Sequence, residues 1–277
     1  MANVLTNLAA DIYKAADVVG RELVGFIPAV TVNGDAVTRV AKGDTVRSHF
    51  TRTPTVSTTF APAMTIPEGT DQTVDNKTMS VDTYATVQIP WTGEDMKHVN
   101  NGSGFETIYG DQIRQAMRAI CNTIELSLFT TAYQGASRAT GTAGTTPFAS
   151  TIDVVADVRK ILVDNGCPMD GNVSLVMNTA AGAAMRKLTN LYKVNEAGGS
   201  DMLRQGVLLD LQGLMLRESA QISQVTKGTG ASYLLNGALA VGATTITVDT
   251  GSNTILAGDI VTFAGTTDKY VVNTALS

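Results

Sequence analysis

Acidic side chains, histidines and cysteines could do chemistry in this 277-residue chain, but only two histidines and two cysteines are present. The stretch EDMKH places three potential metal ligands between Glu94 and His98, at the expected corner between a strand and a helix. Such short clusters are more typical of solvated turns than of metal sites. The other histidine, His49, lies in a strand-rich region, where we expect it to face solvent or a neighbouring subunit. We therefore predict neither a metal nor a cofactor.

Short motifs that resemble catalytic signatures are incomplete. No serine stands in a GxSxG elbow, which an α/β-hydrolase nucleophile requires. The stretch TKGTGAS, residues 226–232, lacks the GxxxxGK[ST] pattern of a phosphate-binding loop and is interpreted as a linker between domains. VDNG (163–166) and VDTG (248–251) match aspartic-protease signatures only over four residues, and the first falls at the expected end of a helix. We predict that the chain is not an enzyme.

The two cysteines, Cys121 and Cys167, form no CxxC pair and are far in sequence from both histidines. This spacing argues against a disulfide framework and against a zinc site. We predict two small, buried, apolar side chains in a reducing compartment.

The composition also limits the classes of function. Charged residues make up 16% of the chain against about 25% in typical soluble domains, while 44% of residues are hydrophobic. A net charge of -5 without any run of Lys or Arg does not favour tight nucleic-acid binding. No apolar run approaches the roughly 20 residues that span a membrane, and the N-terminus lacks the features of a signal peptide. A surface with so few charged residues is typical of chains that pack against other subunits.

The first half of the chain is expected to form an arm and a long hairpin. Apolar residues at helical spacing predict an amphipathic helix from about Val4 to Leu23, which needs a partner surface. Thr- and Val-rich strands between Gly43 and Met96 flank a polar, proline-containing tip. A long hairpin with few large apolar side chains is marginal alone in water, so it should lie on another surface.

A long helix follows the hairpin. SGFE, Ser103 to Glu106, fits a capping box, and the helix is expected from Phe105 to about Tyr133. At about 1.5 Å per residue it would span roughly 40 Å. Its expected apolar stripe consists of Ile113, Ala116, Met117, Ile120, Cys121, Ile124 and Leu128.

The pattern then becomes α/β. A helix within residues 150–166 closed by Gly166, a short buried strand VSLVMN, and a second helix with Asn178 as its N-cap are predicted in that order, before a tight turn near Gly213. From about Lys227, short alternating strands separated by Gly and Asn are typical of a small β-barrel or sandwich.

This order of parts resembles the major capsid proteins of tailed bacteriophages with the Hong-Kong-97 fold. VSLVMN (173–178) and the following helix resemble the family's axial domain, and GVLLDLQGLMLRESAQI (206–222) resembles its returning strand pair. LAGDIVTFAG (256–265) and the later DKYVVNT are similar to the β-barrel inserted in some short-tailed-phage coat proteins. In the family the chain returns from this barrel to complete the core. Here the sequence ends at Ser277, so it is either truncated or carries the barrel as a terminal decoration.

The resemblance implies an α+β fold in five parts. These are an N-terminal arm (1–42), an extended hairpin loop (43–96), a peripheral domain with the spine helix (97–149), an axial domain (150–226) and a β-barrel-like insertion (227–277).

The implied function is a major capsid protein that self-assembles into an icosahedral shell around the phage genome. Its partners would be copies of itself in hexamers and pentamers, a scaffolding protein, a portal, and double-stranded DNA bound without sequence specificity, with no membrane. Its place would be the virion, after assembly in the host bacterial cytoplasm. Candidates for subunit contacts are Phe60, Met64, Glu68 and Asp71 near the hairpin tip, with Leu8 and Ile12 on the arm. The alternative is a β-rich surface adhesin or carbohydrate-binding module.

Overall fold

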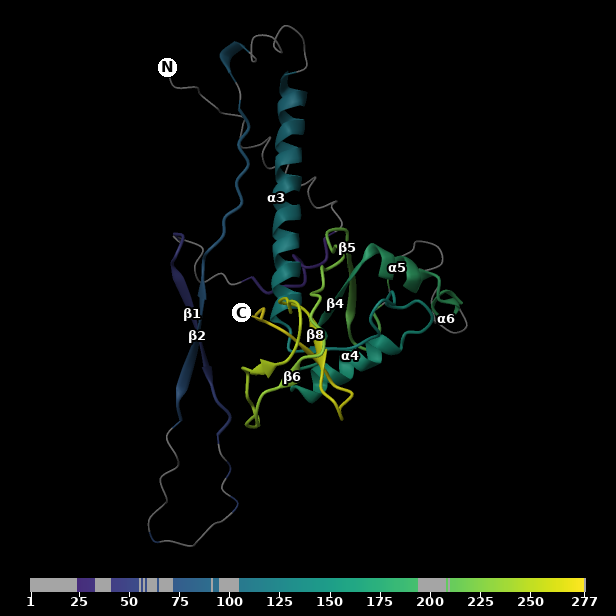
Figure 1. The fold of residues 1–277 in the computed structure, drawn as a ribbon. Coiled ribbons are helices and arrows are strands. Elements are labelled where there is room, and N and C mark those ends of the chain that lie inside the picture. The colour runs from purple at the N-terminus through teal and green to yellow at the C-terminus, as the bar shows by residue number, and fades with distance from the viewer. Residues whose placement is uncertain are drawn as a thin grey trace. The chain divides into compact units, whose positions relative to one another are not determined.

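A computed structural model describes residues 24–32, 41–54, 56, 58, 64, 72–90, 92–94, 105–193, 208 and 210–276. The chain divides into two compact units, one of residues 31–86 and one that joins residues 1–30 to residues 87–277. Figure 1 shows the elements of both, in a mixture of helices and sheets. The mixed α and β content expected from the sequence is confirmed.

The smaller unit contains one antiparallel pair of strands, β1 (Thr45–Thr51) and β2 (Val74–Ser80). Their register runs from Thr45 opposite Ser80 to Thr51 opposite Val74. None of the described residues of this unit is buried. The predicted hairpin is therefore present, and its described part has no core of its own.

The larger unit begins its regular structure with α3 (Phe105–Gly135), a single uninterrupted helix (Figure 1). The helix matches the predicted one to within two residues at its C-terminal end. The capping box cannot be placed, because Ser103 lies outside the described residues. The predicted apolar stripe is wrong at one position, since Ile124 is 40% exposed and the next residue, Glu125, is fully buried.

An α/β unit forms the core. Strands β4 (Ser174–Asn178) and β5 (Met215–Ser219) are parallel, with helices α5 (Thr179–Arg186) and α6 (Thr189–Tyr192) between them in the chain. Helix α4 (Asp153–Asp164) precedes them. The buried apolar cluster consists of Phe148, Val155, Met177, Ala181, Met185, Leu191 and Leu214. The strand VSLVMN and both flanking helices are thus confirmed, although the second helix divides where Leu188 adopts an extended conformation.

Local signals explain the ends of these elements. Gly166, at φ +78°, follows α4, while the Gly166 and Cys167 amides donate to the Val163 and Leu162 carbonyls in the Schellman pattern. Gln212 and Gly213 both have positive φ between the paired residues Leu211 and Leu214, as a two-residue hairpin turn requires.

The terminal stretch forms two small sheets in the described residues and does not close into a barrel there. One sheet pairs β6 (Leu234–Leu235) with β7 (Val248–Asp249). The other has the order β3-β9-β8, formed by β3 (Arg138–Ala139), β9 (Lys269–Val271) and β8 (Ile260–Thr262). Residues that directly follow α3 therefore pair with the last strand of the chain.

The stretch TKGTGAS, predicted as a linker between domains, is held by hydrogen bonds of its backbone amides. The Gly228 amide donates to Asp259 Oδ1 at 2.8 Å, and the Gly230 amide donates to the Thr254 carbonyl at 2.8 Å. A side chain at Gly228 would lie 2.3 Å from Asp259 Oδ2, so glycine is needed for this approach. The two glycines thus fix the start of the terminal stretch against its later loop.

Candidate assembly surface and supporting joint

The hairpin carries an apolar strip on one of its two faces. Directly opposed residues of an antiparallel pair share a face, and successive residues alternate between faces. Val46 opposes Met79, and Phe50 lies four residues after Val46 on the same face, which these side chains share with Ser48, Lys77 and Asp75. Met79 and Phe50 are 56% and 45% exposed. The opposite face carries Arg47, His49, Asn76, several threonines and a single large apolar side chain, Val74.

Most of the residues predicted to contact other subunits lie outside the described residues. These are Phe60, Glu68, Asp71, Leu8 and Ile12. Met64 is described and its side chain is fully exposed. His49 is exposed on β1, as expected, whereas His98 lies outside the described residues.

A buried carboxylate joins the N-terminal segment to the spine helix. Glu125, on α3, accepts hydrogen bonds from three consecutive backbone amides: Gly25 at 2.6 Å, Phe26 at 2.8 Å and Ile27 at 2.9 Å. The amides of Ala29 and Val30 both donate to the Phe26 carbonyl, which makes this segment a single helical turn. The first amides of such a turn have no partner within it, and here the carboxylate supplies one.

The electrostatics of Glu125 favour its ionised form. Burial alone would raise the pKa of this carboxyl group, because the charged form loses its hydration. The hydrogen bonds from Phe26, Gly25 and Ile27, with a further one from the Ser219 side chain, outweigh burial and lower the pKa of Glu125. The Glu125 carboxylate is therefore a charged hydrogen-bond acceptor, stabilised by amide dipoles, rather than a proton donor.

The position of Gly25 in this joint also leaves no room for a side chain. Its position is buried, and an added Cβ would lie 2.5 Å from Val176 Cγ1 and 3.3 Å from the backbone of Glu218. The segment therefore approaches strands β4 and β5 as closely as the backbone allows. The Phe26 ring packs 6.0 Å from the Phe129 ring of α3. One short turn thus connects the helix to the parallel sheet.

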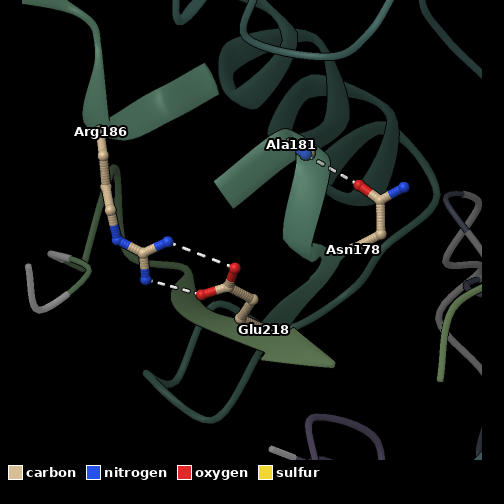
Figure 2. Close-up of polar contacts among 4 residues, drawn as sticks. All are labelled: Asn178, Ala181, Arg186 and Glu218. Carbon is tan, nitrogen blue, oxygen red and sulfur yellow. Dashed lines mark hydrogen bonds and ion pairs between the residues drawn. The ribbon is translucent and has the colours of Figure 1, made fainter. Parts of the chain in front are cut away.

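A second polar group fastens α5 to β5, as Figure 2 shows. Arg186 donates to Glu218 at 2.6 and 3.2 Å in a bidentate pair, and this pairing raises the pKa of Arg186. An added Cβ at Gly182 would lie 2.5 Å from Glu218 Oε1. At the start of the helix, Asn178 Oδ1 accepts from the Ala181 amide at 2.8 Å and confirms the predicted N-cap.

The terminal strands are fastened to the end of the spine helix. Arg138 pairs with Asp268 at 3.1 Å, and its guanidinium carbon lies 4.4 Å from the centre of the Tyr270 ring. Asn273 Nδ2 donates to the Gln134 carbonyl at 2.8 Å. These contacts fix the terminal stretch to the chain segment that leaves α3.

The described residues contain no group of three or more His, Cys, Asp or Glu side chains that could hold a metal ion. Of the EDMKH stretch, only Glu94 belongs to this part of the chain, and it is exposed. Neither cysteine forms a disulfide within the described residues, and both are half-buried, so the prediction that they are buried was too strong. Among the helices of the described part, none has the length and apolar character to cross a membrane.

The structural roles of two residues, Glu125 and Phe148, were not predicted from the sequence. Glu125 stands four residues after Cys121 and four before Phe129, so it occupies the helical stripe itself, and that spacing was the available signal. Phe148 lies in a turn before α4, where it is 4% exposed at φ +63° and belongs to the core. Neither residue could have been assigned its partner from local sequence.

Comparisons with known proteins match this chain to a protein family and to solved structures. The family model described as P22 coat protein, gene protein 5, matches residues 63–269, about three quarters of the chain. A solved structure from Mycobacterium phage Che8 has a TM-score of 0.53 and 15% sequence identity, covering 90% of this chain and 84% of that chain. No curated protein matches.

Proposed function

The chain belongs to the P22 coat protein family, and from this premise we propose how its parts build a shell. Membership makes the chain a bacteriophage major capsid protein that forms the shell of the virion, and the fold shared with the Che8 structure agrees with it. The adhesin alternative has no comparable support. Because the family is a structural one, we propose that the chain has no catalytic role.

The hairpin acts as an arm that docks on a neighbouring subunit. The observation that carries this proposal is its lack of any buried residue in the described part, combined with the apolar strip of Val46, Phe50 and Met79. Burial of apolar surface contributes about 25 cal/mol per Å². A neighbouring copy can supply that burial, and its absence leaves the strip in water. The contacts predicted for Phe60, Met64, Glu68 and Asp71 near the tip would extend this interface, and Leu8 and Ile12 would add to it from the arm.

The remaining parts follow the layout of the Hong-Kong-97 fold in this proposal. Residues 1–42 form the arm, 43–96 the extended loop, 97–149 the peripheral domain with the spine helix, and 150–226 the axial domain. Residues 227–277 belong to a β-barrel-like insertion domain. The parallel pair β4–β5, the helices beside it and the long α3 support this division.

The proposed partners are those of a shell protein. Copies of the chain form hexamers and pentamers, a scaffolding protein and a portal act in assembly within the host cytoplasm, and the finished shell encloses double-stranded DNA. The low net charge of -5 suits enclosure without tight binding, because DNA affinity depends on phosphate neutralisation by basic residues.

Adjacent residues of β1 offer a matched test. Phe50→Lys replaces an exposed apolar side chain beside Val46 and Met79 by a charged one, whereas His49→Lys places the same charged side chain on the other face. Purified proteins would be compared by sedimentation velocity and negative-stain microscopy. We expect shells or rings from the wild type and from His49→Lys, and only small species from Phe50→Lys. Normal shells from Phe50→Lys would contradict the docking role, and a wild type that remains monomeric would contradict assembly itself.

A further inference from the structure

The dipeptide Asn-Gly occurs at residues 33–34, 101–102, 165–166 and 236–237, and the structure describes the last two of these. An asparagine before a glycine can lose its side-chain amide without an enzyme, because glycine has no Cβ to hinder attack by its backbone nitrogen. The attack requires a backbone amide that can give up its proton to solvent, and a side chain that is free to turn toward it. The two described dipeptides differ in both respects.

Hydrogen bonds at the end of α4 hold the first dipeptide, Asn165 and Gly166. The Gly166 amide donates to the Val163 carbonyl at 2.9 Å, so the attacking nitrogen already has a partner. The Asn165 side-chain amide nitrogen donates to the Ile161 carbonyl at 2.6 Å, which directs this side chain back along the helix. Attack at this dipeptide therefore requires the end of the helix to open first.

The second dipeptide lies where the chain leaves β6, and both Asn236 and Gly237 are exposed. The Asn236 backbone amide donates to the Thr247 carbonyl at 3.0 Å, which fixes the chain before the asparagine side chain. Within the described residues, neither the Gly237 amide nor the Asn236 side chain has a hydrogen-bond partner. No atom of this part of the chain lies within 4 Å of a Cβ built on Gly237, so the following peptide has room to rotate.

We propose that Asn236 is a site of spontaneous deamidation in the folded chain, whereas the fold protects Asn165. The Gly237 nitrogen loses its proton to solvent hydroxide and forms a bond to Asn236 Cγ. The bond from Cγ to the side-chain nitrogen breaks, and that nitrogen leaves as ammonia with a proton from water. The succinimide ring then opens when water adds to either of its carbonyl carbons. One opening gives aspartate, and the other gives isoaspartate, in which the main chain continues through the side-chain carboxyl carbon. Water is the only co-reactant, and nothing is oxidised or reduced.

The reaction places a negative charge in a part of the chain that has no charge. No charged residue stands between Lys227 and Asp249, and the new carboxylate lowers the net charge by one unit from -5. The preceding side chain, Leu235, is itself 47% exposed, so the charge appears beside an apolar surface. The inference goes beyond the shell-forming function and does not depend on it. The time that the chain spends in water, rather than a partner or an enzyme, determines this charge.

Peptide mapping by mass spectrometry of the full-length chain tests the proposal. The chain is kept in mildly alkaline buffer, and conversion at Asn165 and Asn236 is followed in the folded protein and, in parallel, in urea. In the folded protein we expect Asn236 to convert about tenfold faster than Asn165 or more, because the hydrogen bonds around Asn165 must break first. In urea the two rates should become similar, because both asparagines precede a glycine. Mapping separates these sites from residues 33–34 and 101–102.

Asn236→Gln provides the matched variant, because glutamine would have to close a larger ring, which forms far more slowly. Circular dichroism checks that this exposed substitution leaves the fold intact, and conversion at Asn165 should be unchanged. Hydroxylamine cleaves a chain at a succinimide, so it should cut the folded wild type after residue 236 and leave this bond intact in Asn236→Gln. Absence of that cut in the wild type, or equal rates at the two asparagines in the folded protein, would overturn the proposal. A rate difference that persists in urea would also overturn it, because the flanking residues rather than the fold would then be its cause.

Discussion

Replacement of Glu125 tests the joint between the N-terminal segment and the spine helix. Its carboxylate is fully buried and accepts three backbone amides at 2.6–2.9 Å. A hydrogen bond to a charged group contributes about 1.5–3 kcal/mol, and a buried donor left without a partner costs about 1–3 kcal/mol. Glu125→Ala removes all three acceptor contacts at once. We expect it to lower the free energy of unfolding by about 3–5 kcal/mol, as when a buried charge network is broken.

Glu125→Gln separates charge from shape. Glutamine keeps one carbonyl oxygen that can accept a hydrogen bond. Its NH2 group is a donor, however, and would face a backbone N–H, which is also a donor. We expect a loss of about 2–3 kcal/mol. Both variants would be measured by urea unfolding of the unassembled chain, followed by far-UV circular dichroism. The control is Glu94→Gln, because Glu94 is exposed and should change stability by no more than about 0.5 kcal/mol. A Glu125→Gln protein as stable as this control would refute the reasoning.

The pH dependence gives an independent check. Burial raises the pKa of Glu125, but the amides and Ser219 more than offset it, so the folded pKa lies below the ordinary value. A group with a lowered folded pKa contributes stability above its unfolded pKa, and that contribution is lost as the pH falls through the folded pKa. The stability difference between wild type and Glu125→Gln should therefore shrink on acidification. A constant difference would show that the charge is not responsible.

Two further substitutions test the α/β unit by the same urea assay. Asn178→Ala removes the side-chain cap from the Ala181 amide and should cost about 1 kcal/mol, whereas Asn178→Asp should keep most of it; equal losses would refute the cap. Gly182→Ala introduces a Cβ 2.5 Å from Glu218 Oε1 and should cost about 1–3 kcal/mol, and an unchanged midpoint would show that this site is not tightly packed.

The elements that the sequence predicted well carry their signals locally. Asn178 stands directly before a helix, and its side chain caps that helix. Gly166 ends α4 because it adopts a positive φ that few other residues tolerate. Gly213 marks the tight turn for the same reason. In each case the residue acts on backbone groups within a few positions, so no knowledge of the fold is needed.

The features that the sequence did not predict depend on distant partners. The predicted apolar stripe contains Ile124 and not Glu125, because the prediction used hydrophobicity alone. Glu125 is buried instead, because its carboxylate accepts hydrogen bonds from three backbone amides about a hundred residues away in sequence. The burial of Phe148 was also not predicted, because nothing near it in sequence indicates the cluster around Val155 and Met185 into which it packs. Long-range satisfaction of polar groups and long-range packing thus account for both errors.

In the proposed function, folding and assembly use different apolar residues of this chain. The buried cluster lies between Phe148 and Leu214, where parallel strands and short helices enclose it. Other apolar residues are exposed outside this cluster, among them Phe50, Val74 and Met79 on β1–β2. A subunit with this division can fold around its own core before it meets a neighbour, because its contact surfaces contribute little to that core. We therefore expect charge substitutions on the exposed apolar side chains of the hairpin to impair assembly without loss of the folded chain.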